Sequence, residues 1–140
     1  MGQETLIKGT IMTTWNGLVG FLATNYTCTI NGTSVSLPYS FPDGRSQNVF
    51  VNLGGNDNRG EWVFVTSAIA EISHVGKLEA ICRMATSRIC GGVVIDGNFI
   101  ILRAAMPLEN IDENEINGLI GTVVEIADEL EQMFTGANNF

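Results

Sequence analysis

The first stretch of the chain has the hydrophobic and polar pattern of a helix. Between residues 11 and 24 apolar side chains recur at the spacing of one helical face, at Ile11, Trp15, Leu18, Val19 and Leu22. Thr10 precedes this run and is a residue type that caps helices. The pattern predicts a first helix over residues 11–24, in which Gly17 and Gly20 each cost about 1 kcal/mol relative to alanine. We expect residues 1–10 to be irregular.

Three strand-like segments follow, and each is bounded by residues that favour turns. They are TCTINGTSVSLPYSF (27–41), QNVFVNL (47–53) and EWVFVTSAIA (61–70). Asn31-Gly32 is a hairpin signal, FPDGR indicates a turn, and GGNDNRG indicates a longer loop between the second and third segments. Together they predict an antiparallel meander. The third strand carries apolar side chains on both faces, because Trp62 and Phe64 alternate with valines.

A second helix and a further pair of strands are predicted next. Over residues 75–89 the apolar seam consists of Val75, Leu78, Cys82, Ala85 and Ile89. Ala80 and Met84 point away from that seam. The segment GGVVIDGNFIILRAAM (91–106) then predicts two strands around Asp96-Gly97, which is the strongest hairpin signal of the chain.

The pattern changes at Pro107, which lacks the N–H group that a strand interior needs. Asp112 and Glu115 have the spacing of a capping box, and acids in the first turn suit the helix dipole. We therefore predict a helix over Glu113–Phe134, about 33 Å long at 1.5 Å per residue. Its apolar stripe consists of Ile116, Leu119, Ile120, Val123, Ala127, Leu130 and Phe134.

Val124, Ile126 and Met133 widen this stripe to about half of the helix circumference. A long helix that lies across a twisted sheet explains such a stripe. The alternative is that one edge of the stripe, with Val124 and Met133, also contacts a partner. Beyond the helix we expect residues 135–140 to form a disordered tail.

Composition narrows the classes of partner. The 140 residues, 45% of them apolar, suffice for a single domain over residues 1–140. Fifteen acidic against seven basic residues give a net charge of -8, which repels nucleic acid and anionic membranes, so we expect neither as a partner. No apolar run approaches the roughly 20 residues that span a bilayer. Three cysteines without CxxC spacing and no secretion-signal pattern lead us to expect a cytoplasmic protein.

No residue pattern in the chain identifies a reaction. His74 is the only histidine, HExxH, CxxC and GxSxG spacings are absent, and Cys28, Cys82 and Cys90 lie in apolar stretches that favour buried thiols. LGGNDNRG precedes a strand, whereas a phosphate-binding loop precedes a helix. The acids of the last helix, Glu125, Asp128, Glu129 and Glu131, favour a solvated face over a cation site. We therefore expect no enzyme activity, no cofactor and no metal.

Residues 88–134, RICGGVVIDGNFIILRAAMPLENIDENEINGLIGTVVEIADELEQMF, resemble the C-terminal half of the YbjN family, a group described as bacterial sensory transduction regulators. The shared features are the Asp96-Gly97 hairpin, Leu102-Arg103-Ala104, Pro107-Leu108-Glu109, the cap at Asp112 and Ala127-Asp128-Glu129-Leu130. The predicted element order α-β-β-β-α-β-β-α also resembles the fold of type III secretion chaperones. The resemblance implies an α+β fold with an antiparallel five-stranded sheet and three helices.

The resemblance further implies a small acidic protein that forms a homodimer and holds a polypeptide partner. In chaperones of this fold the sheet and the second helix make the dimer contact, which implies an interface at Trp62, Phe64, Ala80, Ile81 and Met84. We expect a non-enzymatic protein-binding domain, chaperone-like or a regulatory adaptor.

Two alternatives stay open. The first is a small-molecule-binding domain with its site between sheet and helices, where Cys82, Cys90, His74 and Arg103 would lie. Arg103 would then be buried with a carboxylate or ligand, whereas the simpler reading is that it faces solvent from an edge strand. The second alternative is a structural subunit of a larger assembly.

Overall fold

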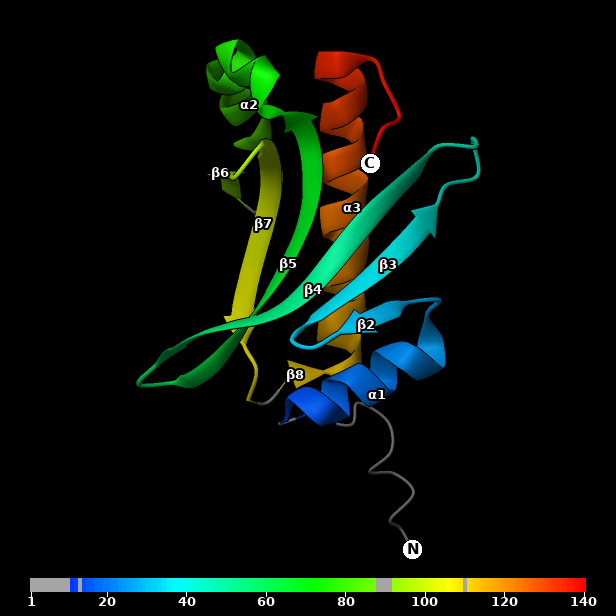
Figure 1. The fold of residues 1–140 in the computed structure, drawn as a ribbon, viewed down its shortest axis with the longest axis vertical. Coiled ribbons are helices and arrows are strands. Elements are labelled where there is room, and N and C mark those ends of the chain that lie inside the picture. The colour runs from blue at the N-terminus through cyan, green and yellow to red at the C-terminus, as the bar shows by residue number, and fades with distance from the viewer. Residues whose placement is uncertain (1–10, 13, 88–91, 110) are drawn as a thin grey trace, which may run out of the picture.

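The computed structural model of the chain describes residues 11–12, 14–87, 92–109 and 111–140, and these residues have an α+β fold (Figure 1). The elements in chain order are β1 (Ile11–Met12), α1 (Trp15–Asn25), β2 (Thr29–Asn31), β3 (Ser34–Ser40), β4 (Ser46–Asp57), β5 (Gly60–Glu71), the 3-10 helix η2 (Ile72–Lys77), α2 (Leu78–Ala85), β6 (Gly92–Asp96), β7 (Phe99–Pro107), β8 (Ile111–Asp112) and α3 (Glu113–Thr135). None of the described helices is long and apolar enough to cross a membrane.

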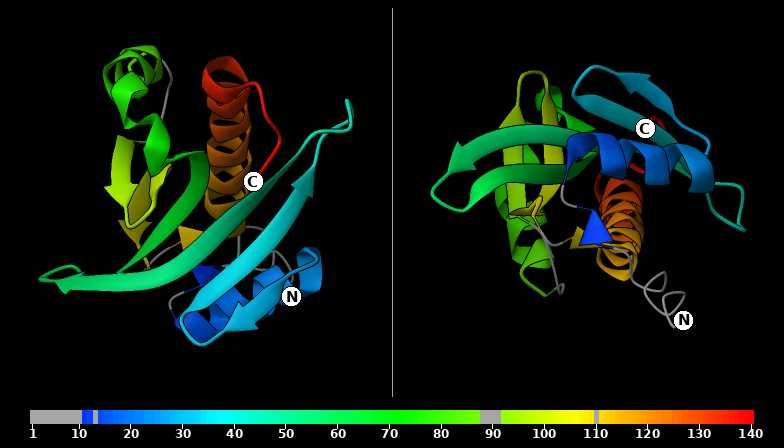
Figure 2. Two further views of the ribbon diagram at one scale, coloured as in Figure 1. Left: turned by 45° about the horizontal axis from the view of Figure 1, so that its top comes forward. Right: turned by 90° about the horizontal axis from the view of Figure 1, so that it is seen from below.

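Six strands form one antiparallel sheet in the order β2-β3-β4-β5-β7-β6, and β1 pairs with β8 in a separate ribbon. The sheet is strongly twisted, and α3 lies along one of its faces, in contact with β4, β5 and β7 (Figure 2). We call the face against α3 the inner face and the opposite one the outer face. α1 and α2 lie at opposite ends of the molecule (Figure 1).

Strand alternation places a row of aliphatic side chains on the inner face. This row consists of Val35, Leu37, Val49, Val51, Val63, Val65, Ile100 and Leu102, all fully buried. From α3 it is met by Ile116, Ile120, Val123, Val124, Ala127 and Leu130, which are buried as well. The core therefore lies between α3 and the inner face, because only there can both apolar surfaces leave water together.

The predicted start of the last helix is confirmed. The Asp112 carboxylate accepts the Glu115 N–H at 2.8 Å, and the Glu115 carboxylate accepts the Asp112 N–H at 3.0 Å. At the other end Gly136 adopts a left-handed conformation with φ of 70°, which ends α3 one residue beyond the predicted limit.

The main sheet has six strands rather than the five expected. The Asn31-Gly32 hairpin signal divides the first predicted segment into β2 and β3, which pair with each other. The loop predicted at residues 54–60 is also wrong. Instead β4 continues to Asp57 through a bulge at Gly55, whose φ of 68° suits glycine, and a tight turn leads into β5.

The first two helices differ from the prediction at their ends. α1 is capped by Thr14, whose side-chain oxygen accepts the Gly17 N–H at 3.0 Å, while Ile11 belongs to β1. The predicted second helix is split into η2 and α2, and its last residues, from 88 onward, lie outside the described residues, as do residues 1–10. A 3-10 helix has three residues per turn instead of 3.6. The side chains of η2 therefore do not fall on the face that the α-helical spacing of α2 predicts for them.

Replacing Ile120 by Ala should lower the free energy of unfolding by about 2–5 kcal/mol, because it removes a buried side chain between α3 and the inner face. The matched control is Ile95→Ala, on a half-exposed isoleucine of β6, which should lower it by less than about 1 kcal/mol. Urea denaturation followed by circular dichroism measures both. Equal losses for the two variants would contradict this placement of the core.

Candidate functional site

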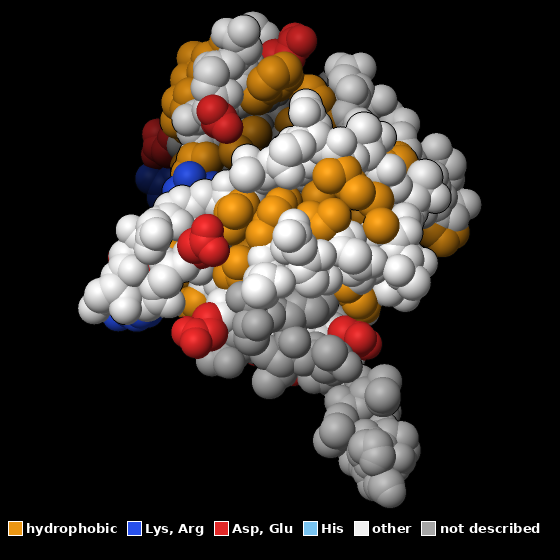
Figure 3. Space-filling view, turned by 60° about the horizontal axis from the view of Figure 1, so that its bottom comes forward, with side chains coloured by type: hydrophobic (Ala, Val, Ile, Leu, Met, Phe, Trp, Pro, Cys, Tyr) orange, Lys and Arg blue, Asp and Glu red, His pale blue; other side chains and the backbone are white. Residues whose placement is uncertain are grey.

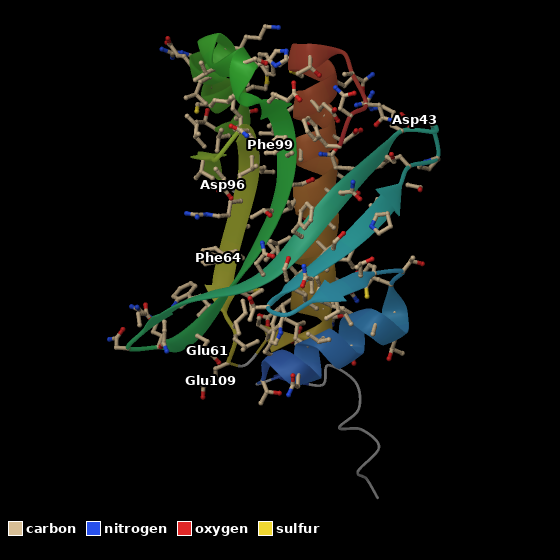
Figure 4. The ribbon with its side chains drawn as sticks, in the orientation of Figure 1. Asp43, Glu61, Phe64, Asp96, Phe99 and Glu109 are labelled. Atoms are coloured by element: carbon tan, nitrogen blue, oxygen red, sulfur yellow. The ribbon has the colours of Figure 1, made fainter. Side chains whose placement is uncertain are left out.

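The outer face of the sheet carries a hollow of about 370 Å³. We call it the outer-face hollow, and its lining residues are Ser34, Asn48, Phe50, Asn52, Thr66, Ala68, Asp96, Phe99, Ile101, Asn139 and Phe140. In the strands these residues alternate with the inner-face residues, so the packing of the core determines which way they point. Figure 4 shows Asp96 and Phe99 close together at the β6–β7 turn, with Phe64 farther along the sheet.

Aromatic and aliphatic side chains form the apolar part of the hollow. Phe50 is 38% exposed and Phe99 is 40% exposed, although both are large hydrophobic residues. Ala68 and Ile101 stand opposite each other in the β5–β7 register. The Phe99 ring also meets the Phe140 ring edge-on, with 5.8 Å between centroids. The hollow thus offers an apolar contact surface that solvent reaches.

Neutral polar groups surround these rings. Asn48 and Asn52 of β4, Ser34 of β3 and Thr66 of β5 contribute amides and hydroxyls. The Ser34 hydroxyl donates to Asn52 Oδ1 at 2.6 Å. Among the lining residues Asp96 alone has an ionisable side chain. The site is suited to hydrogen bonding and apolar contact more than to charge neutralisation.

The shape of the hollow depends on a gap between β4 and β5. β4 pairs with β5 only from Phe50 onward, whereas its first residues pair only with β3, so the two strands separate toward one end (Figure 1). Gln47 is fully buried in this gap, and its Nε2 donates to Ser67 Oγ at 3.0 Å. The Ser67 hydroxyl donates to the carbonyl of Asn48. Side chains, rather than backbone pairs, hold the strands together here.

Residues 136–140 reach the outer face at this gap. Arg45 Nη2 donates to the carbonyl of Ala137 at 2.7 Å, and the Ser46 N–H donates to Asn138 Oδ1 at 3.1 Å. The Asn139 N–H donates to the Glu131 carboxylate at 2.6 Å. The expectation of a disordered tail over residues 135–140 therefore differs from the structure, because these polar partners lie far away in the sequence and leave no local pattern.

A buried charged cluster stands behind the gap. Arg45 Nη2 lies 3.0 Å from Asp128 Oδ1 and 3.6 Å from Glu131 Oε1, and Glu131 is 0% exposed. Burial raises the pKa of Glu131, an effect that the Asn139 N–H and the Arg45 charge oppose. The hydrogen bond to Asp128 raises the pKa of Arg45. The predicted solvated acidic face is thus wrong for Asp128 and Glu131, because Arg45 and residues 136–140 cover them.

The candidate interface residues fall into two groups. Ala80 is exposed, Met133 is 48% exposed, and Trp62 and Phe64 are half-buried on the outer face. Ala80 and Met133 are therefore open to a partner, and the two aromatic residues are partly so.

The remaining candidates face the core. Ile81 and Val124 are 0% exposed, and Met84 packs against the core. Ile81 and Val124 therefore cannot contact a partner in this structure, which corrects the expectation for them, whereas Met84 is half-buried and keeps part of its side chain exposed. In α2, Leu78 and Ala85 pack against the core as predicted, but Ile81 rather than Cys82 is the buried residue between them. Val75 lies exposed in η2, outside the seam.

Arg103 is exposed on the outer face, so the solvent-facing interpretation is confirmed, although β7 lies between β5 and β6 rather than at an edge. Its guanidinium carbon lies 4.9 Å from the centre of the Phe64 ring, a cation–π contact. Cys28 and Cys82 are free, half-buried thiols, and Cys90 lies outside the described residues. Within the described parts of the chain no group of three or more His, Cys, Asp or Glu residues is placed to hold a metal.

A scan against known protein families finds no match to this chain, and a search of curated protein sequences finds no relative. Sequence reasoning did not single out Phe50 and Phe99, which form the apolar part of the hollow. The signal was present in β4, where Phe50 stands alone on the face opposite Val49 and Val51.

Glu131→Gln should change how stability depends on pH. Because burial raises the pKa of Glu131 in the folded protein, protonation favours folding. That contribution is complete below the pKa of the unfolded chain, near 4.5, and is lost as the pH rises through the higher folded value. The free energy of unfolding of the wild type, minus that of the variant, should therefore increase as the pH falls from about 7 to 4.

Urea midpoints across this pH range measure the difference. Glu125→Gln, on an exposed glutamate of the same helix, is the control. A difference that stays constant, or that shrinks toward low pH, would show that Glu131 is not held in a desolvated position.

Proposed function

We propose that the protein is a non-enzymatic protein-binding domain, chaperone-like or a regulatory adaptor, whose outer-face hollow accepts an apolar side chain of an extended polypeptide partner. The supporting observation is the hollow itself, where Phe50 and Phe99 are accessible beside neutral amides and hydroxyls. Aromatic rings supply apolar contact area, and amides and hydroxyls can bond to the peptide groups of a bound segment.

The lining residues support binding over catalysis. Among the described residues of the hollow there is no histidine, cysteine or lysine, and Asp96 has no second titratable group beside it in the lining. The Ser34 hydroxyl donates to an amide oxygen rather than to a base. Nucleophilic catalysis needs a nucleophile paired with a base, and acid–base catalysis needs a titratable group tuned to the reaction.

Charge favours a partner with basic residues next to its apolar side chain. The chain carries a net charge of -8, and Glu71 and Asp96 flank Phe99 in the sheet register, one on each neighbouring strand. In Figure 3 hydrophobic side chains gather in the middle of the face and around α2, while Lys and Arg side chains show only at its left edge. A segment with an aromatic residue beside Lys or Arg complements this arrangement.

The fold is consistent with the resemblance on which part of this proposal rests. A chaperone-like arrangement related to the YbjN family would combine an antiparallel sheet with three helices, and the α+β architecture of the described residues has that composition. The homodimer that the resemblance implies stays a prediction, which light scattering of the purified protein tests. Its contacts would be drawn from Trp62, Phe64, Ala80, Met84 and Met133, which are exposed or half-buried.

A small-molecule ligand is the second candidate, and the volume of the hollow favours it. About 370 Å³ lies within the range of ligand pockets. The site would then lie on the outer face rather than between sheet and helices, where aliphatic side chains fill the space. A thermal-shift screen of metabolites separates the two candidates, because a true ligand raises the melting temperature by mass action.

Selection from a library of short random peptides should yield sequences with an aromatic residue next to Lys or Arg. Phe50→Ser should then weaken binding of a selected peptide by about tenfold or more, because it removes an aromatic anchor from the hollow. Titration by fluorescence anisotropy measures the affinity. Val75→Ser, on a half-exposed apolar residue of η2 outside the hollow, is the control and should bind as the wild type does.

Three outcomes would overturn the proposal. One is a selection that yields no binding peptide, and another is selected peptides that bind Phe50→Ser and the wild type equally. The third is a metabolite that stabilises the protein and occupies the hollow, which would establish the small-molecule function in its place.

A further inference from the structure

The segment 136–140 contributes part of the lining of the outer-face hollow. Asn139 and Phe140 belong to its lining, and the Phe140 ring meets the Phe99 ring edge-on at 5.8 Å with an interplanar angle of 87°. This edge-to-face geometry is the preferred contact of two aromatic rings. The chain thus places one of its own aromatic side chains where the proposed function places that of a partner.

The segment is anchored upstream of this ring. Ala137, Asn138 and Asn139 are each held by a hydrogen bond to Arg45, Ser46 or Glu131, groups that belong to the β3–β4 turn, the start of β4 and α3. None of these three anchors involves a lining residue of β5, β6 or β7. The anchors fix the direction of the segment, while the contact with the hollow is made by the ring of Phe140.

Gly136 makes this path accessible. Its φ of 70° turns the chain back from the end of α3, and Arg45 then donates a hydrogen bond to the carbonyl of the next residue, Ala137. A tethered ring has a high effective concentration at the hollow, so even a weak contact competes with a free partner. A partner binds only those molecules whose hollow is free. Its apparent affinity is therefore its intrinsic affinity multiplied by the fraction of molecules with a free hollow.

We infer that residues 136–140 form a strap that holds Phe140 in the outer-face hollow as an internal ligand, in competition with an aromatic side chain of the polypeptide partner. This inference rests on the proposed function and adds its regulation. Partner binding displaces the ring of Phe140 from Phe99 while the anchors at Arg45 and Glu131 keep the segment near the sheet. The strap also limits the expected partner to one with an aromatic side chain, because the aromatic ring of Phe140 contacts Phe99 in the hollow.

The test compares Phe140→Ala with the wild type and with Phe140→Tyr, all as full chains. Affinity for a peptide selected on the wild type should rise about two- to tenfold in Phe140→Ala, the range expected for one aromatic pair. Phe140→Tyr keeps a ring and should bind as the wild type does. Asn138→Ala keeps the Phe140 side chain but removes the acceptor of the Ser46 N–H, which loosens the strap, and it should also raise the affinity.

A second readout needs no peptide. The fluorescent hydrophobic dye 8-anilinonaphthalene-1-sulfonate should bind Phe140→Ala more strongly than Phe140→Tyr, because the empty position exposes Phe99. If dye binding rises but no peptide binds any variant, the strap is supported and the proposed function fails. If peptides bind but dye and peptide affinities are unchanged in Phe140→Ala, the strap is overturned and the proposed function stands. Weaker peptide binding by Phe140→Ala also overturns it, since Phe140 would then be a wall of the site.

Discussion

The packing of α3 against the inner face of the sheet is the interaction on which the rest of the structure depends. The inner side chains of four strands and the buried stripe of α3 leave water together, and no other pair of described surfaces combines so many aliphatic residues. Because strand side chains alternate, this contact also determines the opposite face. When Val49 and Val51 point to α3, Phe50 must point outward, and with it Thr66 across the β4–β5 register. The accessible aromatic hollow follows from how the core is packed.

The same helix determines where the charged cluster and the strap lie. α3 carries Asp128 and Glu131 beside the place where β4 and β5 separate, and Arg45 approaches them from the β3–β4 turn. A carboxylate as buried as that of Glu131 needs donors, and the Asn139 N–H is one of them. The chain after α3 is thus drawn toward the gap by the need to satisfy a buried acid, and this brings Phe140 to Phe99.

Features encoded by neighbouring residues could be predicted from the sequence. The capping box at Asp112 and Glu115 and the hairpin at Asp96-Gly97 depend on contacts within a few residues, and both appear in the structure. The extension of β4 to Asp57 could not be predicted, because Gly54 and Gly55 carry the chemistry of a loop and only the bulge reconciles them with a strand. The seam of the second helix was misassigned at Val75, because a 3-10 helix with a kink at His74 precedes α2, and at Cys82, where the neighbouring Ile81 is the buried residue.

The candidate site was harder to predict than the fold, because it depends on which strands are neighbours. Phe50 and Phe99 are separated by about a third of the chain and share a hollow only through the β4-β5-β7 order. The single exposed phenylalanine of β4 could have been noticed from alternation, but the gap that Gln47 bridges depends on a pairing that stops at Phe50. Local patterns carry no information about where a pairing stops.

That unpaired stretch gives the sheet unequal stiffness along its length. From Phe50 to Asp57 a ladder interrupted by the bulge at Gly55 fixes the spacing of β4 and β5, whereas beyond Phe50 the two halves of the sheet are joined through Gln47 and Ser67. Spreading the halves at that end breaks a few side-chain hydrogen bonds and leaves the backbone ladder intact. The sheet therefore resists spreading less at its unpaired end than along the paired stretch.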